Sequence, residues 1–474
     1  MSLPDPVSDF PAWYQEVVKQ AEMAESSLAR GSMVIRPYGY AIWEAIQQGL
    51  DRRIKETGHS NVYFPLLIPQ SLLEKEAEHV EGFTPQVALV THGGGQKLEE
   101  PLAIRPTSEA IIWATYAKWI QSYRDLPLLY NQWANVVRWE MRTRLFLRSS
   151  EFLWQEGHTA HETSVEAIAE AKMILTEVYR PALERDFAIP VLAGRKSASE
   201  RFPGAVETFA IEAMMRDRKA LQAGTSHYLG QNFGKAYDVQ FLGRDGKQAY
   251  PYATSWGVST RLIGGLIMAH GDEKGLRLPP RLAPVQVVIV PIYRSDEELV
   301  AVRQAANEIA SASQGVRMKF DDREQHRPGY KFNEWELKGV PIRLEIGPRD
   351  LASGQAVVYR RDTGEKAPAP IAELAGRLPA LLDEIQQNLF DQALEFRKAN
   401  TFSPGSYDEL QEIAAGAKGF AEAPWCGEVV CEEKVKSETK ATIRILPLDQ
   451  EPPDGHCIVC GAPATEKAIW AQSY

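Results

Sequence analysis

Residues 131–158, NQWANVVRWEMRTRLFLRSSEFLWQEGH, mix arginines and acids with five aromatic side chains. This mixture suits a nucleotide pocket better than a buried core, where charged side chains are rare. Arg138 and Arg148 can hold a polyphosphate, because a planar guanidinium bonds phosphate and carboxylate oxygens together. Glu140 and Glu156 can accept hydrogen bonds from amine donors, and Phe152 can lie flat on a purine. The stretch therefore predicts an adenylate pocket.

Length and composition limit the class of protein. A chain of 474 residues is too long for one core and predicts two to four domains. The net charge of -10 argues against binding nucleic acid over the whole surface but allows a local basic groove. No apolar run has transmembrane length, and the N-terminal MSLPDPVSDF is acidic and interrupted by proline, unlike a signal peptide. We expect a cytoplasmic protein without membrane contact.

The first part of the chain alternates helical and extended patterns. Apolar residues recur at helical spacing over 10–18, 42–54 and 163–183. NVYFPLLIP, residues 61–69, predicts a strand that Pro65 confines to an edge or an interface. Mostly short strands surround the helices, which favours an antiparallel sheet with flanking helices over a doubly wound sheet.

A proline-rich linker at 276–284, LRLPPRLAP, is the best candidate for a domain boundary. Beyond it lie the continuous apolar run VQVVIVPI, a helical pattern over 297–312, and strands near Val316 and Ile342. This order of buried strands and helices predicts a small α/β domain.

All four cysteines lie in the last fifty residues, as the pairs Cys426/Cys431 and Cys457/Cys460. Two closely spaced pairs in a cytosolic chain suit tetrahedral Zn²⁺ better than disulfides. Four thiolates leave no position for water, so we predict a structural zinc site. Disulfides, free thiols, or His456 in place of one cysteine are the alternatives.

AIRPTSE, residues 103–109, brings Thr107 and Glu109 to the same side of an extended or turning backbone. A secondary ammonium has two N–H donors, and a hydroxyl plus a carboxylate would satisfy both. TSE is also an ordinary helix start before the helical run IIWATYAKWI. The two roles can coexist.

LQAGTSHYLGQNF, residues 221–233, offers neutral hydrogen-bonding groups. Gln222 and Thr225 can bond an adenine or a ribose, and His227 can line an amino-acid pocket. A purely structural histidine is the alternative at this position.

ATSWGVSTRLIGGLIMAHGD, residues 253–272, combines a flat apolar floor with a cation. Trp256 and Gly257 form the floor, and Arg261 near a helix start can reach the γ-phosphate of a bent ATP, helped by the helix dipole. The glycine pair that follows indicates close packing of that helix on the sheet, and tight packing alone is the structural alternative.

The segments RPYGYAIWEAI, NVYFPLLIP, AIRPTSE, NQWANVVRWE, FLWQEGHTA, QAGTSHYLGQNF and TSWGVSTRLIGG together resemble prolyl-tRNA synthetases of the archaeal and eukaryotic type, which are class II aminoacyl-tRNA synthetases. Residues 131–158 resemble motif 2, which decides the fold class. The region of Arg261 resembles motif 3, although Thr260 stands where generic members have an acid. The resemblance implies an α/β multidomain protein with an α+β catalytic core. Its parts would be a class II catalytic domain at 1–283, an α/β anticodon-binding domain at 284–398 and a zinc-binding domain at 399–474.

The resemblance implies a proline–tRNA ligase, which activates L-proline with ATP and Mg²⁺ to prolyl-adenylate and transfers it to the 3′ end of tRNA(Pro). Arg138 and Arg261 would be catalytic. Proline would contact Thr107, Glu109, Arg138, Trp154, Glu156, His158, His227, Trp256 and Gly257. ATP would contact Arg138, Glu140, Arg148, Phe152, Gln222, Thr225 and Arg261. Glu336 and Arg343 would contact the anticodon.

The resemblance also implies a homodimer with Pro65 at its interface, and a C-terminus at Tyr474 that folds back towards the catalytic domain. Bacterial-type members insert an editing domain between motifs 2 and 3, but Glu156 and Trp256 are only 256 − 156 = 100 positions apart. That interval leaves no room for a further domain of about 50 to 250 residues beside the predicted helix and strands. We therefore expect no editing of mischarged alanine in cis.

Two alternatives use the same fold. One is a synthetase for threonine, serine, glycine or histidine; against it, Trp154, Trp256 and His158 suit a ring-shaped apolar substrate. The other is a non-catalytic paralogue that binds RNA or regulates. Against it, all the phosphate-binding arginines of the pattern are present.

Overall fold

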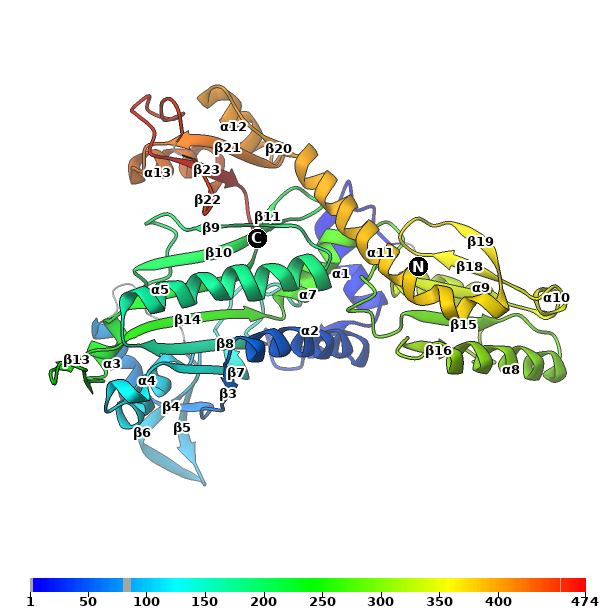
Figure 1. Ribbon diagram of the computed structural model, residues 1–474, viewed down its shortest axis with the longest axis horizontal. Coiled ribbons are helices and arrows are strands. Elements are labelled where there is room, and N and C mark those ends of the chain that lie inside the picture. The colour runs from blue at the N-terminus through cyan, green and yellow to red at the C-terminus, as the bar shows by residue number, and fades with distance from the viewer. Residues whose placement is uncertain (1–2, 80–86, 452) are drawn as a thin grey trace.

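The computed structural model describes residues 3–79, 87–451 and 453–474. Within them the largest sheet has eleven strands in the order β20-β21-β23-β22-β9-β10-β11-β14-β8-β7-β3 (Figure 1). Neighbouring strands are antiparallel except at the two edges, where β3 pairs with β7 and β20 with β21 in parallel. The predicted antiparallel sheet is confirmed. Its strands are β3 (Ser60–Asn61), β7 (Leu128–Val137), β8 (Glu151–His161), β9 (Val191–Arg195), β10 (Glu207–Met214), β11 (Ala220–Gly230), β14 (Tyr252–Ser259), β20 (Thr401–Phe402), β21 (Phe420–Trp425), β22 (Thr442–Pro447) and β23 (Glu466–Ala471).

Helices pack on the sheet as the apolar spacing predicts. The helix over 163–183 is confirmed as α5 (Ser164–Met173), which continues through the π-helical turns η2 (Ile174–Tyr179) and η3 (Ala182–Asp186) and crosses one face of the sheet (Figure 1). Thr163 and Glu166 start α5 with a reciprocal capping box. The other two predicted helices are α1 (Phe10–Gln20) and α2 (Pro37–Glu56), whose apolar faces join the same core as α7 (Arg261–His270).

The predicted strand over residues 61–69 is wrong. Only its ends are extended, in β3 and in β4 (Leu67–Pro69), and these belong to different sheets. Pro65 has no N–H to donate to a ladder. The backbone of Phe64 instead bonds side chains, with its N–H donating to Gln132 at 2.5 Å and its carbonyl accepting from Arg105 at 2.8 Å.

Smaller elements surround the eleven-stranded sheet. A three-stranded sheet, ordered β4-β6-β5, projects from it (Figure 1). A separate hairpin pairs β12 with β13. The remaining elements of this part are β1 (Ala24–Ser26), β2 (Met33–Ile35), α3 (Gln70–His79), β5 (Leu89–Gly93), β6 (Gln96–Ile104), α4 (Glu109–Trp119), η1 (Tyr123–Asp125), α6 (Asn232–Ala236), β12 (Phe241–Leu242) and β13 (Gln248–Ala249).

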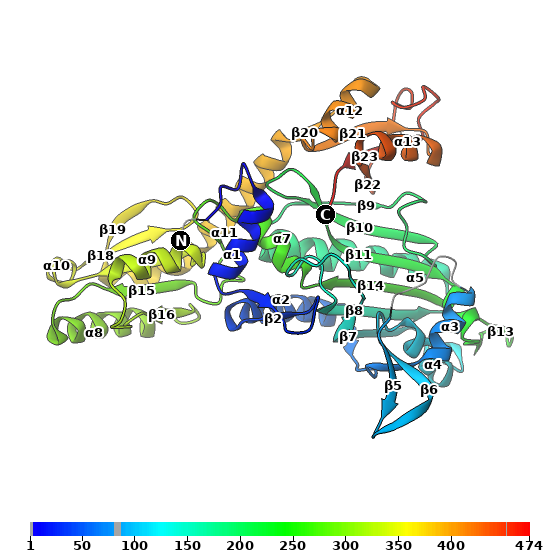
Figure 2. The ribbon, with the colours of Figure 1, turned by 180° about the vertical axis from the view of Figure 1, so that it is seen from behind.

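A separate five-stranded sheet confirms the predicted small α/β domain. Its order is β16-β15-β17-β18-β19, with β15 parallel to both neighbours, and it has its own apolar core. The long helix α11 leads from this domain back to the eleven-stranded sheet (Figure 2). The elements are β15 (Val287–Pro291), α8 (Asp296–Ala312), β16 (Met318–Phe320), α9 (Pro328–Leu337), β17 (Ile342–Ile346), α10 (Pro348–Ala352), β18 (Gln355–Arg360), β19 (Lys366–Pro370) and α11 (Ile371–Ala399).

The C-terminal part extends the eleven-stranded sheet instead of forming a separate sheet. Its strand β22 pairs with β9, and Gly194 permits this approach because a Cβ there would lie 2.6 Å from the Ile445 Cβ. Two helices, α12 (Tyr407–Ala415) and α13 (Val429–Thr439), complete it. Tyr474 lies against the catalytic part, and its hydroxyl donates to the Asp217 carboxylate at 2.6 Å. Among the described residues, no helix is long and apolar enough to cross a membrane.

Candidate active site

The face of the sheet opposite α5 carries a cavity of about 300 Å³. Cross-strand partners share a face, so the register aligns His158, Ser255 and His227 in one row and Glu156, Gly257 and Thr225 in the next. Of the predicted proline and ATP contacts, all but Glu140 and Arg148 line this cavity. Those lining it are Thr107, Glu109, Arg138, Phe152, Trp154, Glu156, His158, Gln222, Thr225, His227, Trp256, Gly257 and Arg261.

A β-bulge explains why Gln222 and Thr225 both face the cavity. Their separation of three residues would put them on opposite faces of a regular strand. The register of β10 and β11 shifts at Ile211 and Glu212, so Gln222 pairs with Glu212 while Thr225 pairs with Ala210. The extra residue restores both side chains to the same face.

Glu156 is the centre of a buried hydrogen-bond network. It accepts from Ser108 Oγ at 2.5 Å, from Gln132 Nε2 at 2.8 Å and from His158 Nε2 at 2.9 Å. Burial alone would raise its pKa, but the bonds from His158, Ser108 and Gln132 lower the pKa below its ordinary value. The pKa of His158 is raised: burial would lower it, and the hydrogen bond to Glu156 with the charge of Glu109 prevails.

Thr107 and Glu109 meet at the junction of β6 and α4. Glu109 is the first residue of α4 and is buried, and the Thr107 hydroxyl donates to its carboxylate. Ser108 occupies the N-cap but makes no capping bond, because its hydroxyl donates to Glu156. Glu109, Glu156 and His158 hold ligand atoms within 4.8 Å of one another. Two carboxylates beside one imidazole suit an ammonium group, because even a charged ring would balance only one of them.

Arg138 projects from the end of β7 over two aromatic rings. Its Nε donates to the Pro106 carbonyl at 2.9 Å, and its guanidinium lies 5.1 Å from the Trp154 ring and 5.6 Å from the Phe152 ring. These contacts fix the plane of the guanidinium. Within the described ranges its two terminal nitrogens have no protein acceptor, so they are available to an anion in the cavity.

Arg261 begins α7 at the other end of the cavity, where its Nε donates to the Leu147 carbonyl at 3.3 Å. Burial lowers its pKa, and the positive charges of Arg148 and Arg138 act in the same direction. None of these three arginines forms an ion pair with a described residue. Unpaired cations beside a cavity favour binding of a polyphosphate.

The segment between β7 and β8 carries Arg148 and Glu140. Both lie outside the cavity lining. Their charges nevertheless act on Arg261. Arg148 lowers the pKa of Arg261 and Glu140 raises it, and the pKa is lowered overall, chiefly by burial. They therefore lie near Arg261, outside the cavity lining.

Trp256 differs from the expected floor of the pocket. Its ring lies on the opposite face of the sheet in the main core, edge-on to His59 at 5.1 Å and to Tyr179 at 6.4 Å. Alternation along β14 accounts for this, because Gly257 and Ser255 take the cavity face. Gly157 makes space for the ring, since a Cβ there would lie 2.1 Å from it. The rings of Trp154, Phe152 and Phe202 give the cavity its aromatic lining instead.

Sequence reasoning missed several residues that line the cavity: Glu200, Arg201, Phe202, Thr208, Ser255 and Ser259. Phe202 stacks at a tilt on His227 with centroids 4.7 Å apart, and Thr208 Oγ1 lies 3.0 Å from His227 Nδ1. Burial lowers the pKa of His227 to about 3, so the ring is neutral. The loop of Phe202 has no periodicity, whereas Thr208 and Ser255 were predictable from strand alternation alone.

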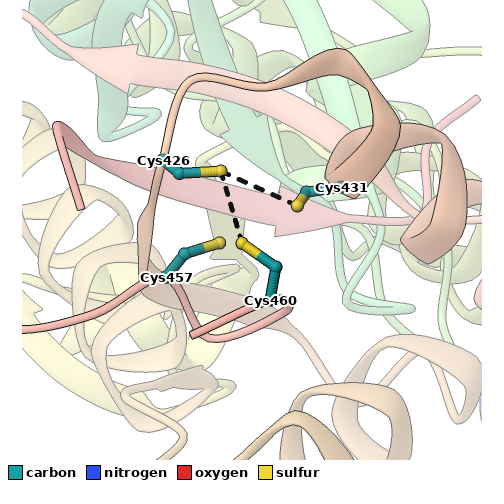
Figure 3. A group of neighbouring side chains, drawn as sticks. All are labelled: Cys426, Cys431, Cys457 and Cys460. Atoms are coloured by element: carbon teal, nitrogen blue, oxygen red, sulfur yellow. Dashed lines mark hydrogen bonds between the residues drawn. The ribbon is translucent and has the colours of Figure 1, made fainter. Parts of the chain in front are cut away.

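The four cysteines converge as predicted. Their sulfur atoms lie within 4.8 Å of one another, with Cys426 Sγ 3.7 Å from Cys431 Sγ and 3.8 Å from Cys460 Sγ (Figure 3). Four thiolates about 2.3 Å from a tetrahedral zinc ion would be separated by about 3.8 Å. The cluster is therefore compatible with zinc. His456 is not among the residues of this cluster.

The predicted anticodon residues lie in the small α/β domain, Glu336 on α9 and Arg343 on β17. Arg343 is sandwiched between Phe332 and Tyr359, 4.4 and 4.2 Å from their rings, and its Nη2 bonds Glu345 at 2.9 Å. Glu336 accepts from the Tyr359 hydroxyl and from Lys274 at 3.0 Å. The two candidates thus contact the same tyrosine.

Comparisons with known proteins agree along the whole chain. The model of the tRNA synthetase class II core domain (G, H, P, S and T) matches residues 90–270, the anticodon binding domain matches 286–381, and the prolyl-tRNA synthetase C-terminal family matches 407–474. The proline–tRNA ligase of Chlorobium phaeobacteroides is 55% identical over 478 residues, covering 98% of both chains. The chain belongs to the prolyl-tRNA synthetase family. The ligase of Chloroflexus aggregans is also 55% identical, again over 98% of both chains.

A solved relative has the same fold. The prolyl-tRNA synthetase from Cryptosporidium parvum, crystallised with halofuginone and AMPPNP, has a TM-score of 0.93 at 42% identity, over 100% of this chain and 97% of that one. This chain is thus a proline–tRNA ligase with a class II core and an anticodon-binding domain. The class implies proline, ATP with Mg²⁺, and tRNA as its reactants and partners.

Proposed function

We propose that the cavity joins L-proline to ATP, forming prolyl-adenylate and pyrophosphate, and then passes the prolyl group to the terminal ribose of tRNA(Pro). The observation that carries this is the order of charges along one cavity, with paired acids at one end and unpaired arginines at the other. Arg138 lies between them. An amino acid and a triphosphate meeting head to head require that order.

The acidic end suits the ammonium of proline. The Thr107 hydroxyl and the Glu109 carboxylate can together accept both N–H groups of a secondary ammonium, and Glu156 adds a second negative charge. Trp154, His158 and the neutral His227 would enclose the pyrrolidine ring. Trp256 and Gly257 would contribute backbone to this wall. The pocket would recognise the ring by shape rather than by hydrogen bonds.

The basic end suits ATP. Phe152 would stack on the adenine, Gln222 and Thr225 would bond the base or ribose, and Arg148 with Glu140 would close over the nucleotide. Arg138 would stabilise charge on the α-phosphate, and Arg261 with Mg²⁺ would hold the leaving pyrophosphate. Binding of an ATP analogue by the solved relative supports this assignment.

Substitution of Arg138 tests the assignment. Arg138→Ala should lower proline-dependent ATP–pyrophosphate exchange by about 10³-fold, as loss of a transition-state donor does. Arg142→Ala, an exposed arginine of the same loop, is the matched control and should stay near wild type. Near wild-type exchange by Arg138→Ala would exclude Arg138 from catalysis.

We further propose the boundaries 1–283, 284–398 and 399–474 for the three domains, and membership of the archaeal and eukaryotic type. The interval from Glu156 to Trp256 contains α5, its π-helical turns, the short helix α6, sheet strands and one hairpin, which supports the proposal that no editing domain is inserted. Addition of alanyl-tRNA(Pro) tests this, since an enzyme without editing leaves it intact and an editing enzyme hydrolyses it.

Three assignments concern partners and metal. Glu336 and Arg343 would read anticodon bases by accepting from and donating to guanine edges. The four cysteines would hold a structural zinc ion. A homodimer would form at Pro65, supported by the exposure of Tyr63 (68%) and Leu67 (40%) beside it. Light scattering that gives the mass of one chain would exclude the dimer.

A further inference from the structure

Residues 196–204, which follow β9, form one wall of the cavity. Glu200 and Phe202 of this segment line it, and the Phe202 ring rests on the His227 ring. The Phe202 N–H donates to Thr208 Oγ1 at 3.1 Å, and the same oxygen contacts the His227 imidazole at 3.0 Å. The segment therefore shapes the end of the cavity that we assign to proline, and the following inference rests on that assignment.

Helix α13 of the C-terminal part contacts this segment through two pairs of side chains. Ser197 Oγ donates to the Glu432 carboxyl at 2.7 Å, and both residues are 1% exposed. Lys436 Nζ lies 3.2 Å from the Glu200 carboxylate at the surface. A buried hydrogen bond is the stronger link of the two, because water screens the exposed pair.

The start of the segment is fixed by β22. Lys196 is buried, and its Nζ donates to the Glu212 carboxylate and to the Arg444 carbonyl, both at 2.7 Å. Arg444 Nη2 donates to the same Glu212 oxygen at 3.0 Å. Figures 1 and 2 show β22 alongside β9, immediately before the segment leaves the sheet. The C-terminal part thus contacts the segment at its start and along its length.

We propose that the C-terminal part is a positioning element for the amino-acid pocket. Through Glu432 and Lys436 it keeps residues 196–204 in the conformation that seats Phe202 on His227. Ser197 and Glu432 do not line the cavity and act only through the segment. Loss of this hold lowers the fraction of enzyme ready to bind proline, which raises the apparent dissociation constant in proportion. ATP binds at the other end and is unaffected.

Kinetics of full-length variants test the proposal. Ser197→Ala should raise the KM for proline roughly 10-fold, the effect of losing one buried hydrogen bond, with kcat and the KM for ATP within about twofold of wild type. Lys436→Ala, a surface change without folding risk, should raise the same KM about twofold. Lys418→Ala is its control, because Lys418 pairs with Glu412 inside the C-terminal part and should change nothing.

Amide hydrogen exchange by mass spectrometry gives a second readout. Ser197→Ala should speed exchange within residues 197–204 and leave β7 and β8 protected. Unchanged exchange and unchanged KM values in folded protein would overturn the positioning role, as would an equal loss of kcat and of affinity for both substrates. Faster exchange with a raised KM for ATP alone would show that the Ser197 contact orders the segment. It would also show that the segment does not shape the proline site, which overturns the proposal.

Discussion

Replacing Glu156 with glutamine perturbs the acidic end of the cavity with little change of shape. Glu156 is 2% exposed and accepts three hydrogen bonds, from Ser108, Gln132 and His158. Glutamine offers one acceptor oxygen, turns an NH₂ group towards a donor, and removes the charge opposite the substrate ammonium. A hydrogen bond to a charged group contributes about 1.5–3 kcal/mol, and little solvent is present to reduce that figure. At about 1.4 kcal/mol per tenfold, proline binding should weaken about 10- to 100-fold.

The assay is proline-dependent ATP–pyrophosphate exchange with each substrate varied in turn. Glu156→Gln should raise the KM for proline by that factor and leave the KM for ATP within about twofold. Glu151→Gln is the matched control, because Glu151 starts the same strand, is exposed, and its carboxylate accepts from Asn135 outside the Glu156 network. A folded Glu156→Gln enzyme with a wild-type KM for proline would refute the placement of the ammonium beside Glu156.

Three further changes have defined outcomes. The Glu156–His158 pair should stabilise the fold most between about pH 4.5 and 6.5. Its contribution is lost at lower pH, where Glu156 with its lowered pKa becomes protonated, and at higher pH, where His158 with its raised pKa loses its proton. Comparing the melting temperatures of wild type and Glu156→Gln across pH measures this contribution. Gly157→Ala should cost about 1–3 kcal/mol in urea unfolding, because its Cβ would lie 2.1 Å from the Trp256 ring; an unchanged midpoint would mean that the ring moves freely. Cys460→Ser should lower both the amount of zinc bound per chain, measured by elemental analysis, and the melting temperature. Wild-type protein that purifies without metal would contradict the zinc site.

Much of the architecture was predictable because it follows from periodicity and local chemistry. The spacing of apolar residues located α2 and α5, and the two cysteine pairs located the sulfur cluster. The strand predicted over residues 61–69 failed because side chains from distant segments, Gln132 and Arg105, bond the backbone of Phe64. No local pattern reveals such partners.

Within the site, residue type was easier to predict than orientation. Trp256 looked like a pocket floor because it is a large aromatic beside a glycine. Its face of the sheet depends on the register of β14, which only the paired strands define. Phe202 was missed for a related reason. Its irregular loop bonds Thr208 and, through Ser197, the distant Glu432 of the C-terminal part.

A crystal structure with a non-hydrolysable prolyl-adenylate analogue tests the central claim most directly. The account predicts the prolyl nitrogen at hydrogen-bonding distance, about 3 Å, from Thr107 Oγ1 and the Glu109 carboxylate, and the Arg138 guanidinium on the phosphate oxygens. An analogue bound in the reverse sense, with its adenine beside Glu109 or its phosphate remote from Arg138, would contradict it.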